Sequence, residues 1–114
     1  MQIVITCQRP HHNVANTIIP DLVDGECIIS AALMGPEGFT IERTSNQFKP
    51  TSMMTIMDLN PNSSLITVVA EEYTVVVSRL ESGHSIVIQC PNGGNLGKAR
   101  MNLSNACKAI LPFL

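Results

Sequence analysis

A glycine-rich segment is the first part of this sequence that could support chemistry. Asn92–Ala99 (NGGNLGKA) follows an apolar run and precedes an amphipathic stretch, the context in which a phosphate-binding loop occurs. Such a loop needs a glycine five positions before its Gly-Lys pair, for a sharp turn, and Ser or Thr after the pair, to hold Mg²⁺. Asn92 and Ala99 occupy those positions. We therefore interpret the segment as a turn into a capped helix, whose free N–H groups would support at most a weak anion contact.

Histidines and cysteines are the second group of residues with chemical potential. Cys7, His11 and His12 lie close together, but their spacing matches no standard zinc motif, and a closed site would need ligands from elsewhere. No two cysteines are spaced as in a zinc ribbon or a thioredoxin-like site. We predict isolated thiols in a reducing compartment, with no metal and no cofactor, and keep a metal or redox sensor as an alternative. The four cysteines are Cys7, Cys27, Cys90 and Cys107.

Nucleophilic and acid–base catalysis find no support in the sequence. A catalytic Ser or Cys needs a base oriented by a third group, and no local signature of that arrangement is present. Glu71 and Glu72 are adjacent, so their side chains diverge on a strand or in a tight turn. We predict that the chain has no catalytic residues and is not an enzyme.

Short apolar runs predict the elements that carry these residues. Leu65–Ala70, Tyr73–Leu80 and Ser85–Gln89 are rich in β-branched residues and are joined by connectors too short for a crossover helix. They should pair as antiparallel hairpins. Cys27–Met34 and Phe39–Arg43, separated by a glycine-containing turn, predict another hairpin. The fold class is therefore α+β, a single-domain antiparallel sheet of about five strands flanked by helices.

Three helices are predicted around this sheet. Asn13 can cap a short helix that reaches Ile19, and Asn95 can cap a longer helix closed by Pro112. The apolar residues of the longer helix recur every three or four positions, which predicts one face docked on the sheet. These residues are Leu96, Ala99, Leu103, Ala106 and Ile110. The polar residues assigned to the solvent side are Lys98, Arg100, Asn102, Asn105 and Lys108.

A methionine-rich helix between the two groups of strands is the predicted dimer interface. Within Pro50–Leu59, Ser52–Leu59 should be helical, and its apolar side chains project almost all the way round. A fully buried helix in a monomer would also explain that pattern. The chain is short for covering both sides of the helix, so we favour a dimer. The interface residues are Met53, Met54, Ile56, Met57 and Leu59.

Composition limits the remaining classes of function. The 114 residues are 45% apolar and 14% charged, with a net charge of −2. The basic residues are scattered along the sequence, which argues against nucleic acid as a partner. Apolar runs are too short to insert into a membrane, and the first residues do not resemble a leader peptide, so we expect a cytoplasmic chain. We assign residues 1–12 to an N-terminal strand or arm and 13–114 to one domain.

Several local patterns resemble the roadblock superfamily, which includes dynein roadblock light chains and the GTPase-activating protein of bacterial gliding motility. Leu22–Gly25 leading to Cys27–Met34 and then to Gly35–Ile41 resembles the first hairpin of that family. Tyr73–Leu80 with Ser85–Ile88 resembles its last hairpin. Asn95-Leu96-Gly97 is similar to the start of its final helix. The resemblance covers roughly residues 14–114, so 13–114 is described as a roadblock-like domain. Two features depart from it, a shorter central helix and the arm at residues 1–12.

The resemblance implies a function in protein interaction. It implies a homodimer, or a heterodimer with a related roadblock subunit, whose central helices pair and whose sheets join. Such a dimer is a platform or scaffold for a small Ras-like GTPase and supplies no catalytic side chain. Stimulation of hydrolysis would then come from ordering the switch segments of the GTPase itself. A profilin-like or longin-like module of the cytoskeleton or trafficking is the alternative, although the few aromatic residues are a poor basis for a groove that binds Pro-rich peptides.

Overall fold

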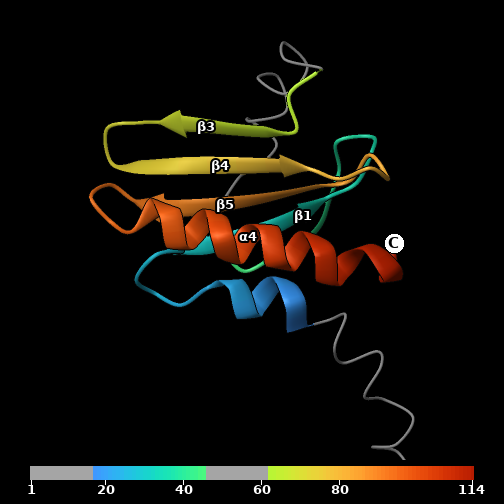
Figure 1. The fold of residues 1–114 in the computed structure, drawn as a ribbon, viewed down its shortest axis with the longest axis horizontal. Coiled ribbons are helices and arrows are strands. Elements are labelled where there is room, and N and C mark those ends of the chain that lie inside the picture. The colour runs from blue at the N-terminus through green and yellow to red at the C-terminus, as the bar shows by residue number, and fades with distance from the viewer. Residues whose placement is uncertain (1–16, 46–61) are drawn as a thin grey trace, which may run out of the picture.

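The computed structural model describes residues 17–45 and 62–114. Five strands in this part of the chain form one antiparallel sheet with the order β2-β1-β5-β4-β3 (Figure 1). The strands are β1 (Ser30–Met34), β2 (Thr40–Arg43), β3 (Leu65–Val69), β4 (Tyr73–Arg79) and β5 (Ser85–Pro91). They are followed by helix α4 (Leu96–Ile110) and the 3₁₀ segment η2 (Leu111–Phe113). The predicted α+β class, with about five antiparallel strands and flanking helices, is confirmed.

Strand β5 joins the two groups of strands that the sequence predicts separately. It pairs with β4 through the hairpin at Gly83, whose φ of 92° favours glycine, and it pairs with β1 on its other side. Ala32 lies opposite Val87 in the β1–β5 ladder. Strands β1 and β5 are both rich in buried apolar residues.

Helix α4 packs along one face of the sheet. Asn95 caps it, because its side-chain oxygen accepts a hydrogen bond from the backbone N–H of Lys98 at 3.0 Å. Its buried residues are Ala99, Leu103, Ala106 and Ile110. Residues 17–22 form helical turns beside α4 on the same face (Figure 1). Ile19 and Leu22 join the α4 side chains, Ile86 and Ile88 in one apolar cluster, so this layer holds the larger core.

The opposite face of the sheet carries a second, separate apolar cluster. Every second residue of the central strands points to this side, as strand geometry requires. In the described part of the chain neither α4 nor the turns at residues 17–22 contribute to it. Its buried members are Ala32, Met34, Val75, Val77 and Val87. The sheet is therefore apolar on both faces, which matches a layered α+β domain.

The structure refines several predicted boundaries. The predicted strand Cys27–Met34 is regular only from Ser30, because Asp24 holds the preceding residues in a turn. Pro112 follows the end of α4 at Ile110 and lies inside η2. The predicted apolar face of α4 is confirmed, since Leu96 packs against the core beside the four buried residues. The predicted solvent side is exposed except at Asn102, which is half-buried. The predicted helix at 52–59, the arm at 1–12 and the proposed interface residues Met53, Met54, Ile56, Met57 and Leu59 lie outside the described residues.

Asp24 organises the turn that leads into β1. One carboxylate oxygen accepts backbone hydrogen bonds from Glu26, Cys27 and Ile28 at 2.9, 2.8 and 3.0 Å. Bonds from Ile28 and Glu26 are the main reason that the pKa of Asp24 falls to about 2. Gly25 completes the turn with a φ of 78°. The carboxylate therefore satisfies three backbone donors that no strand partner reaches.

The first testable prediction concerns this carboxylate. Because the folded-state pKa lies below the ordinary value, the charged form stabilises the fold above about pH 4, and this contribution is lost as the pH falls toward 2. Asp24→Asn should lower Tm at neutral pH, and its difference from the wild type should shrink as the pH falls through that window. Thermal melts across a pH series measure this. Asp21→Asn, at a neighbouring exposed carboxylate, is the control. A Tm difference independent of pH would contradict the argument.

Candidate interaction surfaces

The described residues offer no group of ligands for a metal. Within 17–45 and 62–114, no three His, Cys, Asp or Glu side chains converge. Cys27 and Cys90 are buried free thiols, and burial raises the pKa of Cys90 to about 11. Burial also raises the pKa of Cys107, whose thiol donates a hydrogen bond to Ser78 Oγ at 3.3 Å. The raised pKa values of Cys90 and Cys107 make these two thiols poor nucleophiles at neutral pH. Cys7, His11 and His12 lie outside the described residues.

The glycine-rich turn after β5 has a structural role. β5 is antiparallel to both of its neighbours, so the turn does not belong to a parallel nucleotide-binding sheet. The amide nitrogen of Asn92 donates to the backbone carbonyls of Ala70 and Glu71 at 2.8 and 3.0 Å. Its oxygen accepts a hydrogen bond from the Thr74 hydroxyl at 2.6 Å. Asn92 therefore ties the start of α4 to the β3–β4 turn.

No helix in the described segments is long and apolar enough to cross a membrane.

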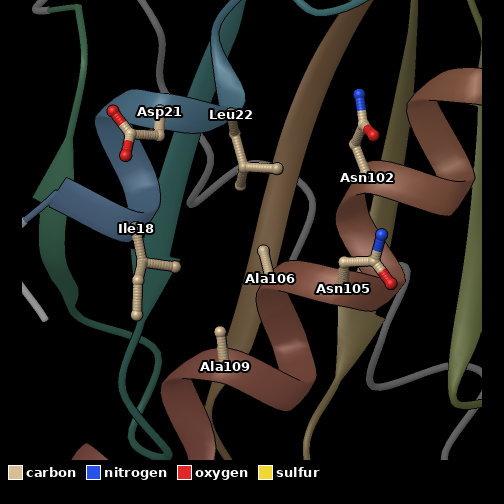
Figure 2. Close-up of a pocket in the computed structure, with 7 residues that line it drawn as sticks. All are labelled: Ile18, Asp21, Leu22, Asn102, Asn105, Ala106 and Ala109. Carbon is tan, nitrogen blue, oxygen red and sulfur yellow. The ribbon is translucent and has the colours of Figure 1, made fainter. Parts of the chain in front are cut away.

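A first surface groove lies between the turns at residues 17–22 and α4. It has a volume of about 360 Å³ and is open to solvent. Figure 2 shows Ile18, Leu22 and Ala106 between the two helical segments, whereas the carboxylate of Asp21, another lining residue, points away from α4. Asn102 and Asn105 contribute amides from α4 (Figure 2). The groove has an apolar floor and a polar rim without a cationic side chain among its described lining residues.

A second groove, which we call the basic groove, runs between α4 and strands β3 and β4. Its volume is about 300 Å³. Arg79 reaches it from the end of β4, and Arg100 and Lys108 reach it from α4. Leu65, Leu103 and Leu111 are the apolar members of its lining. The Arg100 guanidinium donates a hydrogen bond to the Thr67 hydroxyl at 2.8 Å, which holds that side chain against β3.

The basic groove adds a feature that the sequence did not show. Arg100 and Lys108 are exposed, as predicted. The fold also brings them to the same groove as Arg79, which is distant in sequence. One signal was present on α4, because positions 100, 104, 108 and 111 recur at helical spacing and so share a face. The contribution from β4 could not be seen without knowing how the helix crosses the sheet.

The outer edge of β3 is a third candidate surface. Ser64 and Ala70, at either end of the strand, bond to Arg79 and Tyr73 of β4. Because hydrogen-bonded pairs alternate in an antiparallel ladder, the backbone groups of Leu65, Thr67 and Val69 face away from β4. The side chains of Leu65 and Val69 are 48% and 74% exposed. Among the described residues, no other strand pairs with this edge of β3, which presents backbone groups beside apolar side chains.

The two edges of the sheet differ in how well they are protected. β2, at the far edge, carries Glu42 and Arg43, and its pairing with β1 is irregular between Leu33 and Met34. Charges and bulges of this kind discourage pairing with another chain. β3 (LITVV) has no charged residue and no proline, and its register with β4 is continuous. β3 is thus the edge better suited to receive another strand.

Comparison with known proteins identifies the architecture. The sequence matches no protein-family model, and no curated protein matches it at a significant level. Among solved structures, a Roadblock/LC7 domain from Streptomyces avermitilis superposes with a TM-score of 0.73 at 13% identity, covering 84% of this chain and 93% of that one. MglC from Myxococcus xanthus superposes with a TM-score of 0.68 at 17% identity, covering 89% and 99%. The chain has a roadblock-type fold.

The roadblock-type fold shares its layering with profilins. A profilin, LokiProfilin1, solved in complex with rabbit actin, superposes with a TM-score of 0.66 at 14% identity and covers 90% of this chain and 97% of that one. At these identities the likeness concerns the fold alone. The roadblock-type assignment agrees with the resemblance carried by the NLG start of α4 and by the two hairpins, which the structure places as β1–β2 and β4–β5.

Proposed function

We propose that the chain is a cytoplasmic, non-enzymatic roadblock-type module that self-associates and binds or regulates a small Ras-like GTPase. The observation that carries this proposal is the superposition of the domain on Roadblock/LC7 and MglC structures over most of both chains. The similarity of Asn95-Leu96-Gly97 to the start of the family's last helix supports the same choice. The exposed grooves and the open sheet edge suit a module that acts by binding proteins.

Self-association is proposed to extend the sheet through β3. The free backbone groups of Thr67 and Val69 can pair with the same strand of a second copy, which would join the two sheets. An isologous pairing of this kind generates a two-fold dimer without leaving a further open edge at the junction. The methionine-rich segment at 53–57 remains the sequence-based candidate for the other part of the interface. A related roadblock subunit could replace the second copy.

GTPase regulation is proposed to occur without a catalytic side chain from this protein. In the described region, burial raises the pKa of Cys90 and Cys107, and no three His, Cys, Asp or Glu side chains converge. A module of this type can still accelerate hydrolysis by holding the switch segments of the GTPase in their active arrangement.

Affinity capture followed by a kinetic assay tests this function. The tagged chain is incubated with lysate of its source cells, once with GDP and once with a non-hydrolysable GTP analogue. We expect mass spectrometry to identify a Ras-like GTPase whose recovery depends on the nucleotide. Single-turnover GTP hydrolysis by the purified GTPase, with and without the chain, then separates activation from tethering. The tag alone serves as the control for nonspecific binding. If only other proteins are recovered, at equal levels with both nucleotides, the proposal is contradicted.

Actin binding is the second candidate function, because the profilin neighbour was solved with actin. It predicts that the chain slows spontaneous assembly of actin monomers, measured by the fluorescence of pyrene-labelled actin. An unchanged assembly rate at excess chain would remove this alternative.

A further inference from the structure

The basic groove combines cationic side chains with apolar surface. Arg100 and Lys108 are exposed, and Arg79 is half-buried at the end of β4. The described segments contain five basic residues, and three of the five line this groove. No carboxylate is among its described lining residues. A ligand that enters the groove therefore meets positive charge from two sides.

The groove also has an apolar component that a purely ionic ligand would leave unused. Leu103 forms its floor and is only 1% exposed, because it also belongs to the core. Leu65 and Leu111 stand at its margins and are 48% and 38% exposed. Covering these two side chains would remove apolar surface from water, which favours a ligand that carries an apolar group. The hydroxyls of Ser64, Ser78 and Ser104 add polar contacts.

The volume and the charge of the basic groove limit the kinds of ligand that it can bind. The groove is partly open to solvent, and its volume of about 300 Å³ lies at the lower end for small-molecule sites. It has room for one or two side chains of a longer segment. Nucleic-acid sites use many phosphate contacts, whereas the whole chain has a net charge of −2 and the groove holds three cations. An acidic protein segment that also carries a large apolar residue would match both the cationic and the apolar side chains of the groove.

We propose that the basic groove binds an acidic segment of a partner protein, in which aspartate or glutamate residues flank one or two large apolar residues. The carboxylates pair with Arg100 and Lys108, and Arg79 adds to the positive potential from the other side. The apolar residue lies over Leu103, between Leu65 and Leu111. This site does not depend on GTPase binding, and it lies on the α4 side of the sheet.

Peptide selection on the 114-residue chain tests the basic groove. A phage library of random short peptides is selected on the immobilised protein, and the enriched sequences are synthesised with a fluorescent label. We expect enrichment of Asp and Glu around Leu, Ile or Phe, and binding by fluorescence anisotropy that weakens as salt is added. Arg100→Glu with Lys108→Glu should raise Kd at least about tenfold, because two attractions become repulsions.

A charge-matched variant provides the control. Arg43→Glu with Lys98→Glu changes the net charge by the same amount outside the groove and should leave Kd within about twofold of the wild type. Circular dichroism must show that both double variants are folded. Equal weakening by both pairs, or selected peptides without acidic enrichment, would overturn the proposal. So would binding confined to phosphatidylserine vesicles, which would assign the groove to an anionic membrane surface.

Discussion

Val69→Pro is expected to turn the proposed β3-edge dimer into a monomer while leaving the fold intact. The backbone N–H of Val69 faces away from β4, so proline removes a donor to the second copy and none to the chain's own sheet. Val69 is also 74% exposed, so its side chain contributes little to the core. Loss of one or two intermolecular hydrogen bonds, together with the bulk of the ring, should weaken the dimer by about 2–3 kcal/mol, a rise in Kd of roughly 30- to 150-fold. Sedimentation equilibrium over a concentration series measures this change.

Val69→Thr is the matched control for this variant. Threonine keeps the branched β-carbon and the backbone N–H, so the dimer should persist. A dimer of unchanged affinity in Val69→Pro, with a native circular dichroism spectrum, would exclude the β3 edge. Met54→Glu with Met57→Glu tests the sequence-based interface in the same assay. If that pair alone yields monomer, self-association is mediated by the methionine-rich segment.

The largest effect on stability is expected from Ile88→Ala. Ile88 lies on β5 in the middle of the sheet, is fully buried, and packs in the same cluster as the residues of α4. Truncation of a buried isoleucine costs about 2–5 kcal/mol, from lost burial and from the cavity left behind. Because small domains are stable by only about 5–15 kcal/mol, the variant should lose much of its stability and melt roughly 10 °C lower or more.

Two further substitutions show whether that loss comes from the cavity. Ile88→Val removes one methylene and should cost only about 0.5–1.5 kcal/mol. Ile41→Ala, on β2 at a side chain that is 56% exposed, should have a smaller effect than Ile88→Ala. Urea unfolding at one fixed protein concentration gives the three free energies of unfolding. Similar losses at positions 41 and 88 would mean that the described core does not dominate stability.

Local patterns were sufficient for most elements of this fold. β-branched residues and short connectors predicted the strands, since pairing of neighbours through tight turns needs little information from the rest of the chain. Helix α4 followed from the Asn95 cap and the spacing of Ala99, Leu103, Ala106 and Ile110. The less accurate predictions lie where a side chain from another position intervenes. Asp24 delays the start of β1 in this way, by binding the backbone of residues that the apolar pattern assigned to the strand.

The candidate interaction surfaces, unlike the secondary-structure elements, could not be predicted from local patterns. The sequence shows which residues are basic but not that Arg79 meets Arg100 and Lys108, because that meeting depends on how α4 crosses β4. It predicts LITVV as a strand but does not say that this strand lies at the edge of the sheet while β5 lies at its centre. The sequence by itself therefore determined the fold class, the elements and a resemblance to roadblock proteins, since these depend on residues close along the chain. Only the tertiary structure decided the strand order, the unprotected β3 edge and the basic groove, because each requires contacts between residues far apart in sequence.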